Sequence, residues 1–294
     1  MASSKTDIIE GIFRTRYSED TKHLENAVVT LQDVSTAISA FNASGPPKEM
    51  STRNPANFFK DFIRNRKNAN TNWPPYVMSA GFTGRQVTLA NACFEFIPLL
   101  PGQLEPFPEL NFASPTAETP RYLIESVSLP LASRRLGRND EPWLIQVITR
   151  LRIVESHFSM ASTRKVRQLD LLQMNVKLAG TEIDALYLAQ EEVSEGHLEE
   201  VIVTCEAKGG RDDILEDQII RQAKAPFTMK QIKQDVVIPI AVKCVGPSMV
   251  HVIEFAPLNR SDFSLVNSLT IASDSLFEIR PPVPGISISK KHIK

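Results

Sequence analysis

The sequence predicts an α/β protein in which a mixed sheet follows a mainly helical N-terminal region. In its central stretch, Thr181 to Gln222, an apolar run and the β-branched run Val201–Cys205 flank a polar turn, which is a hairpin pattern. A helical pattern begins at Asp212, and two β-rich runs, 236–245 and 249–255, follow it. We therefore expect the hairpin and the two later strands to form one sheet.

The chain is long enough for two domains. It has 294 residues, of which 42% are hydrophobic, so a core of useful size is available. Prolines recur between residues 98 and 120 and indicate an irregular connection. We expect an N-terminal region over residues 1–120 and a second domain over residues 121–294.

The N-terminal region shows helical spacing of apolar residues over 20–43, and a second helix is predicted to start at Asn54-Pro55. The basic residues Arg64, Arg66 and Lys67 lie at the end of this helix, where they also suit the helix dipole. The net charge is −1, so a nucleic-acid site needs basic residues gathered locally. These three side chains are candidates for phosphate contacts, and a solvated helix face is the alternative.

A loop rich in Asn, Pro and Gly follows and carries Trp73, Arg85 and Gln86. Arg and Gln side chains read guanine and adenine edges in the major groove. Arg85 and Gln86 are therefore candidate base-reading residues, and an ordinary connecting loop is the alternative. Helix, helix, loop and strand in succession would suit a small DNA-recognition module.

Two acids and a lysine are the candidate chemical groups of the central hairpin. If the hairpin is symmetric about Glu195, Asp184 and Glu206 face each other, with Cβ atoms about 4.5–5.5 Å apart. Lys208 follows Glu206 by two residues and shares its face of the strand. Two carboxylates this close repel each other unless a cation lies between them, and hard divalent cations prefer oxygen ligands. A surface hairpin with solvated charges is the alternative.

This pattern resembles the PD-(D/E)XK nuclease superfamily, the fold of many restriction endonucleases. The matching residues are Asp184 for the first acid and Glu206-Ala207-Lys208 for the second element, followed by a helix that carries Gln218. The resemblance covers roughly residues 144–256, and it implies a restriction-endonuclease-like core. The chain departs from the pattern at Ile183, where many members have proline.

The resemblance implies Mg²⁺-dependent hydrolysis of DNA phosphodiesters. Asp184, Glu206 and the carbonyl of Ala207 would bind the metal ion, and Lys208 would orient the attacking water and stabilise developing charge. Gln218 would support the site from its helix. A helix that precedes the strands supplies a further acid in some members, and Glu155 is the candidate here, with a surface glutamate as the alternative.

Within this class, a sequence-specific restriction endonuclease that binds double-stranded DNA is our first expectation. A structure-specific repair or junction nuclease is the second. From another class, a non-catalytic DNA-binding protein with a nuclease-like fold is the third. The sequence contains no G-x-x-x-x-G-K-[ST] motif, so no nucleotide cofactor is expected.

Location and assembly can also be anticipated. Cys93, Cys205 and Cys244 are far apart and are expected to be free buried thiols in a reducing compartment. Because neither a signal peptide nor an apolar run of membrane-spanning length is visible, we expect a cytoplasmic protein. Duplex cleavage needs two sites, which favours a homodimer. Segments 123–131 and 261–277 are candidate interfaces, or alternatively pack within one chain.

Overall fold

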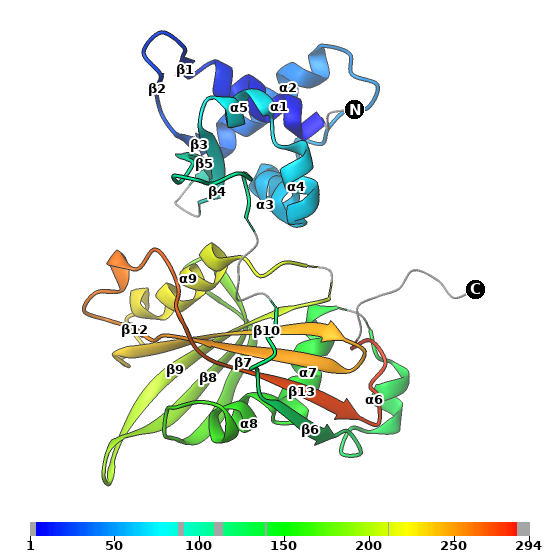
Figure 1. Ribbon diagram of the computed structural model, residues 1–294, viewed down its shortest axis with the longest axis vertical. Coiled ribbons are helices and arrows are strands. Elements are labelled where there is room, and N and C mark those ends of the chain that lie inside the picture. Colours follow the sequence, from blue (N-terminus) through cyan, green and yellow to red (C-terminus); the bar gives the residue numbers. More distant parts are fainter. Residues whose placement is uncertain (1–3, 88–90, 109–113, 139, 211, 287–294) are drawn as a thin grey trace. The chain divides into compact units, whose positions relative to one another are not determined.

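The computed structural model describes residues 4–87, 91–108, 114–138, 140–210 and 212–286. The chain forms two compact units, Met1–Leu110 and Asn111–Lys294 (Figure 1). The sequence placed this boundary somewhat later, at residue 120.

Unit 1 combines short helices with small antiparallel sheets. The order in the larger sheet is β3-β5-β4. The helical prediction over 20–43 is wrong in its first part, because the helix begins only at Leu31 and three short strands precede it. The elements are α1 (Ser4–Arg14), β1 (Tyr17–Ser18), β2 (His23–Leu24), β3 (Val28–Thr30), α2 (Leu31–Ala43), η1 (Pro55–Asn57), α3 (Phe58–Ile63), α4 (Arg66–Asn72), α5 (Pro75–Ser79), β4 (Phe82–Gln86) and β5 (Ala92–Pro98).

Aromatic side chains fill the core of unit 1. The rings of Phe59 and Phe94 stack with centroids 4.6 Å apart, and Trp73 packs edge-on against Phe59. Gly84 permits this packing, since a Cβ there would lie 2.6 Å from Phe59 and 2.9 Å from Trp73. Trp73 is 3% exposed, so it is a core residue and not a surface residue of a loop. Burial of such rings is a main source of stability for a unit of this size.

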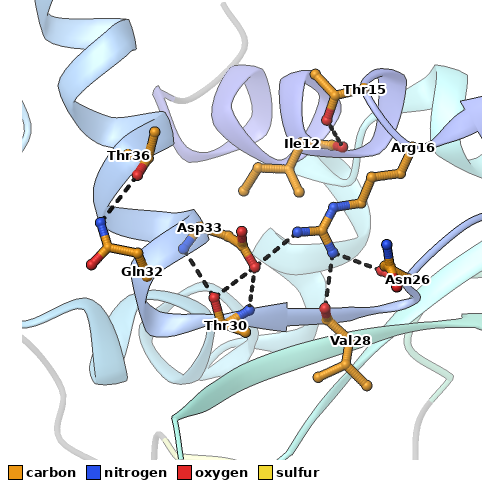
Figure 2. Close-up of polar contacts among 9 residues, drawn as sticks. All are labelled: Ile12, Thr15, Arg16, Asn26, Val28, Thr30, Gln32, Asp33 and Thr36. Carbon is orange, nitrogen blue, oxygen red and sulfur yellow. Dashed lines mark hydrogen bonds and ion pairs between the residues drawn. The ribbon is translucent and has the colours of Figure 1, made fainter.

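A hydrogen-bonded cluster fixes the start of α2 (Figure 2). Thr30 and Asp33 form a capping box, in which Thr30 Oγ1 accepts from the Asp33 N–H at 3.1 Å and Asp33 Oδ2 accepts from the Thr30 N–H at 2.8 Å. Arg16 donates to the carbonyls of Asn26 and Val28 and pairs with Asp33 at 2.8 Å. Burial opposes ionisation of Asp33, but the hydrogen bonds from Thr30 and Arg16 lower its pKa. The cluster therefore ties α1, β3 and α2 together.

Unit 2 contains a large mixed sheet and its helices. None of the helices in the described parts of the chain is long and apolar enough to cross a membrane. The elements are β6 (Arg121–Glu125), α6 (Leu131–Arg135), α7 (Glu141–Arg150), α8 (Ile153–Met160), β7 (Val166–Leu178), β8 (Thr181–Ser194), β9 (His197–Lys208), α9 (Glu216–Lys224), η3 (Ala225–Thr228), β10 (Val236–Gly246), β11 (Met249–Phe255), β12 (Leu258–Asn259), η4 (Phe263–Leu265) and β13 (Ile271–Arg280).

The strand order is β6-β13-β11-β10-β9-β8-β7, with β12 paired to β10. The pairs β9–β10 and β6–β13 are parallel, and the other pairs along this path are antiparallel. The predicted α/β class with a mixed sheet is thus confirmed. Segments 123–131 and 261–277 were expected to lie outside the sheet, which is wrong, because they contribute most of β6 and much of β13.

Helices cover the two faces of this sheet differently (Figure 1). On one face, α7 and α8 pack against alternate residues such as Tyr187, Val203 and Cys205. On the other face, α9 and η3 pack against the intervening positions, including Leu186 and Ile202. Successive side chains of a strand point to opposite faces. Where the start of β8 lies beside the end of β9, the even-numbered residues therefore face α9. Cys205 and Cys244 are free and buried in this unit, and Cys93 is free and buried in unit 1.

Removal of the α2 cap should weaken unit 1. Thr30→Ala deletes the oxygen that accepts from Asp33, and we expect the free energy of unfolding to fall by about 1 kcal/mol. For a unit of this size that loss lowers Tm by about 4–8 °C. Trp73 fluorescence in a Trp143→Phe background would follow unit 1 selectively. Thr36→Ala, six residues further along within α2, is the matched control, and equal effects of the two changes would contradict the capping role.

Candidate functional site

The β8–β9 hairpin has the register that the sequence predicts. Its pairs, from Ala185–Cys205 to Glu192–Leu198, are symmetric about Glu195. Asp184 and Glu206 each lie one residue beyond the first of these pairs, on the face that α9 covers. The Oδ2 atom of Asp184 accepts a hydrogen bond from the N–H of Ala207 at 2.8 Å. The hairpin therefore brings the two predicted acids together.

Glu206 is held by two side chains. The Nζ of Lys208 pairs with its Oε1, and the Nε2 of Gln222 donates to its Oε2. The same Nε2 also donates to the carbonyl of Glu182 at 2.9 Å, which fixes α9 to the start of β8. Glu206 and Gln222 are each 1% exposed, whereas the Lys208 side chain is 12% exposed. Lys208 is thus the member of this group that reaches the surface.

The surroundings of Asp184 disfavour its charged form. Burial first, and then the charge of Glu206, raise the pKa of Asp184 to about 7, although the Ala207 N–H and Lys208 oppose the shift. Burial would lower the pKa of Lys208, but Glu206 and Asp184 outweigh it and raise that pKa. The lysine therefore stays charged, and near neutral pH Asp184 keeps a proton in part of the molecules or exchanges it for a cation.

The donor set suits a hard divalent cation. In an extended strand the N–H and C=O of one residue point to the same neighbour. The Ala207 carbonyl therefore points to the same side as its N–H, toward Asp184. The described residues contain no cluster of three or more His, Cys, Asp and Glu side chains placed to bind a metal ion. One or two carboxylates with added waters are, however, a usual protein contribution to Mg²⁺ binding.

Glu155 does not join this site. It lies on α8, on the face of the sheet that carries Tyr187, and its electrostatic neighbours are Arg152 and Asp170. Burial raises the pKa of Glu155. The sequence placed it correctly on a helix before the strands, but β8 alternates, so that Tyr187 and Asp184 point to opposite faces.

Glu141 is the acid of the preceding helices that interacts with the site. It belongs to the first turn of α7, and its charge contributes to the raised pKa of Lys208. No sequence pattern indicated a role for this residue. In the sequence, Asp140 followed by Glu141-Pro142 indicates the start of a helix. That pattern says nothing about whether Glu141 lies near a functional site.

The glutamine that contacts Glu206 is Gln222 and not Gln218. Gln218 lies one turn earlier on α9, and its Oε1 is buried with no hydrogen-bond partner among the described residues. Residues four apart share one face of a helix, so the sequence could not distinguish the two. A glutamine of this helix thus contacts the site, but it lies one turn later than the glutamine that the sequence indicated.

Arg85 and Gln86 lie in a strand, which corrects the expected loop. Both belong to β4, and Arg85 stands opposite Glu95 of β5, with an ion pair of 2.8 Å between their side chains. The Arg85 side chain is 49% exposed. The Oε1 of Gln86 is buried and has no partner within the described residues. Arg85 is therefore accessible but already paired, and Gln86 is partly enclosed.

Two of the remaining candidate residues of unit 1 lie at a hollow of its surface. Arg66 and Lys67 line it together with Asn70, Thr71 and Glu105, and its volume is about 820 Å³. Arg66 also donates to the carbonyl of Pro108, so it helps to hold the segment before residue 109. Arg64 is exposed at the end of α3.

Comparison of the chain with models of protein families, with curated proteins and with solved structures finds no match.

The pKa of Asp184 has a consequence for stability. Its value of about 7, against an ordinary 3.8, means that the folded chain keeps a proton which the unfolded chain has lost. In metal-free buffer, wild-type stability should therefore decrease as pH rises from about 4 to about 7. Asp184→Asn keeps an acceptor for Ala207 without the charge, so its stability should vary less and exceed that of the wild type above this range. Urea unfolding across pH would measure this, and parallel curves would refute the shifted pKa.

Proposed function

We propose that the protein is a Mg²⁺-dependent DNA endonuclease. The observation that carries this proposal is the meeting of Asp184, Glu206 and Lys208 at one end of the β8–β9 hairpin. The partly buried Asp184 has a raised pKa and lies beside the buried Glu206 and a lysine that reaches the surface, and such shifts of pKa cluster at functional sites. A solvated surface hairpin would leave its carboxylates exposed, whereas Glu206 is 1% exposed.

The order of elements around the site supports the same proposal. After Lys208 the chain forms α9 and then β10, which lies parallel to β9. The resemblance to PD-(D/E)XK nucleases predicts this strand, helix and strand. It also predicts a helix before the first strand, and α7 and α8 precede β7.

In the proposed reaction, Asp184, Glu206 and the Ala207 carbonyl would bind Mg²⁺. When bound, the ion neutralises phosphate charge and lowers the pKa of a coordinated water. Lys208 would orient the attacking water and stabilise the negative charge that develops on the phosphate. Gln222 keeps Glu206 in place through its hydrogen bond, so it acts as a positioning residue.

Unit 1 is the proposed DNA-recognition part of a sequence-specific restriction endonuclease. Arg64, Arg66 and Lys67 would contact phosphates, since they gather at the end of α3 and the start of α4. Arg85 would have to exchange its ion pair with Glu95 for a base contact. Exposed ion pairs of this kind contribute only about 0.2–1 kcal/mol, so the exchange is energetically accessible.

Single substitutions in the acid and lysine set should abolish cleavage. We expect Asp184→Asn, Glu206→Gln and Lys208→Met each to lower the rate by at least about 10²-fold, because each removes a charge that acts on the reacting phosphate. EDTA should stop the wild-type enzyme. Glu200→Gln, which changes an exposed carboxylate on the same strand, is the matched control. Normal cleavage by any of the three variants would remove that residue from the mechanism.

The substrate distinguishes the three functions considered. Incubation of the protein with long duplex DNA and Mg²⁺ should give discrete fragments if it is a restriction endonuclease. Cuts confined to junctions or branched substrates would indicate a repair nuclease. Binding without cleavage under any of these conditions would refute the catalytic proposal and favour a non-catalytic DNA-binding protein.

A homodimer is proposed for duplex cleavage, because one hairpin site cuts one strand at a time. Sedimentation with and without target DNA should show two chains on the duplex, and plasmid cleavage should yield linear DNA. A monomer in both states that releases nicked circles would contradict the dimer.

A further inference from the structure

The strand β6 forms one edge of the large sheet of unit 2 (Figure 1). It pairs in parallel with β13, and within the described part of the chain no strand pairs with its other side. An open edge of this kind is a template on which a strand of another chain can pair. The residues of β6 decide which strand the edge can accept.

The backbone groups of alternate β6 residues point away from β13. The carbonyl of Pro120 accepts a hydrogen bond from β13 at 2.8 Å, and the N–H of Ser126 donates to β13 at 2.7 Å. Because the N–H and C=O of one strand residue point to the same neighbour, the even-numbered residues between these two positions bond to β13. The N–H and C=O groups of Arg121, Leu123 and Glu125 therefore point to the open edge.

The side chains of these three residues form a symmetric pattern. Leu123 is the middle residue of β6, with Arg121 two residues before it and Glu125 two residues after it. All three side chains are exposed, and Leu123 is 65% exposed. Tyr122 and Ile124 point to the opposite face of the sheet, where they pack against the core. The exposed face of β6 thus has an apolar centre between a positive and a negative end.

The two charges of β6 can interact with a second strand. Within the described residues, Arg121 forms no ion pair with an acid of its own chain. Glu125 accepts through Oε2 from two N–H groups of the turn that follows β6, and its Oε1 remains for another donor. Arg280 of β13 stands beside Glu125, but it pairs with Glu278 at 2.6 Å.

We propose that β6 pairs in antiparallel fashion with β6 of a second copy of this chain, about a two-fold axis at Leu123. In this register Arg121 of each copy stands opposite Glu125 of the other, and the two Leu123 side chains meet at the axis. Each of these pairs can exchange both backbone hydrogen bonds, because the N–H and C=O groups already point to the edge. The inference rests on the homodimer of the proposed function and gives it an interface, which forms without DNA or metal.

The opposite edge of the sheet, β7, does not have this self-complementarity. Its pairing with β8 contains two register shifts, and such irregularities interrupt a regular edge. Antiparallel pairing of two β7 strands about their middle residue, Leu172, would place Arg167 opposite Lys177. Like charges directly opposite each other are destabilising. Of the two edges, β6 is therefore the one that fits a second copy.

A protective role for the charges of β6 makes a different prediction. Charged residues on an edge strand discourage pairing with other chains. If Arg121 and Glu125 served only this purpose, the free chain would be a monomer, and reversal of either charge would leave its mass unchanged. In the antiparallel register, by contrast, the two charges attract a strand that carries them in the same order.

The test measures the mass of the full chain by sedimentation in metal-free buffer over a range of protein concentrations. Because β6 has only five residues, we expect a dimer that dissociates on dilution. Leu123→Lys would place two ammonium groups opposite each other at the axis and should raise the dissociation constant at least about tenfold. Leu172→Lys changes an exposed leucine of the β7 edge and is the matched control, for which we expect the wild-type constant.

Charge reversal tests the register. Arg121→Glu opposes two carboxylates at each end of the strand pair, and Glu125→Arg opposes two guanidinium groups, so each variant alone should dissociate about tenfold more readily. A mixture of the two variants should associate again, because one chain then carries two acids and the other carries two bases. Melting temperatures would identify any variant that fails to fold. Hydrogen exchange of the wild type needs no substitution, and protection of the Leu123 amide should rise with protein concentration.

A wild-type chain that remains a monomer at every concentration, with no added protection of β6, would overturn the inference. Equal effects of Leu123→Lys and Leu172→Lys would do the same, as would a mixture of folded charge variants that stays monomeric. A wild type that cleaves DNA as a monomer would remove the interface and leave the nuclease function. A dimer with the expected properties that cleaves no DNA would support the interface and refute the nuclease function.

Discussion

The burial of two adjacent carboxylates is the constraint on which the rest of unit 2 depends. Burial opposes the charge on Asp184 and Glu206, and their mutual repulsion adds to the cost. The ammonium of Lys208, the amide of Gln222 and the N–H of Ala207 offset this cost by direct contact. The first is a side chain of β9, the second is a side chain of α9 and the third belongs to the backbone of β9. The site is therefore formed only when β9 and α9 are both folded.

The hairpin register makes this arrangement specific. Around Glu206, β9 is buried on both faces, with Cys205 and Ala207 toward α7 and α8, and Thr204 and Glu206 toward α9. A slip of one residue would move the Glu206 carboxylate into the apolar α7–α8 core and bring Cys205 to the site. No charged partner of Glu206 lies on that face among the contacts of the described residues. The cost of burying an unpaired carboxylate thus helps to select the native register.

Features that depend on residues close together in the chain can be predicted from the sequence. Contacts between distant segments cannot. The register of Asp184 and Glu206 follows from symmetry about Glu195, within one hairpin. Which glutamine of α9 contacts Glu206, Gln222 or Gln218, depends on how the helix is rotated against the sheet. Tertiary packing sets that rotation. Likewise, the antiparallel pairing of β13 with β11 and its parallel pairing with β6 close the sheet with segments that carry no site motif.

The polar residues on the α9 face extend beyond the acid pair. Lys208, Lys243, His251 and Asp274 lie on four successive strands, β9, β10, β11 and β13, and each is placed by backbone pairing with its neighbour or by a direct side-chain contact. The strand pairing positions these charges, and the largest apolar cluster of the unit lies on the opposite face. Substitutions along this row can therefore alter charge at the site while the apolar contacts of α7 and α8 on the opposite face are kept.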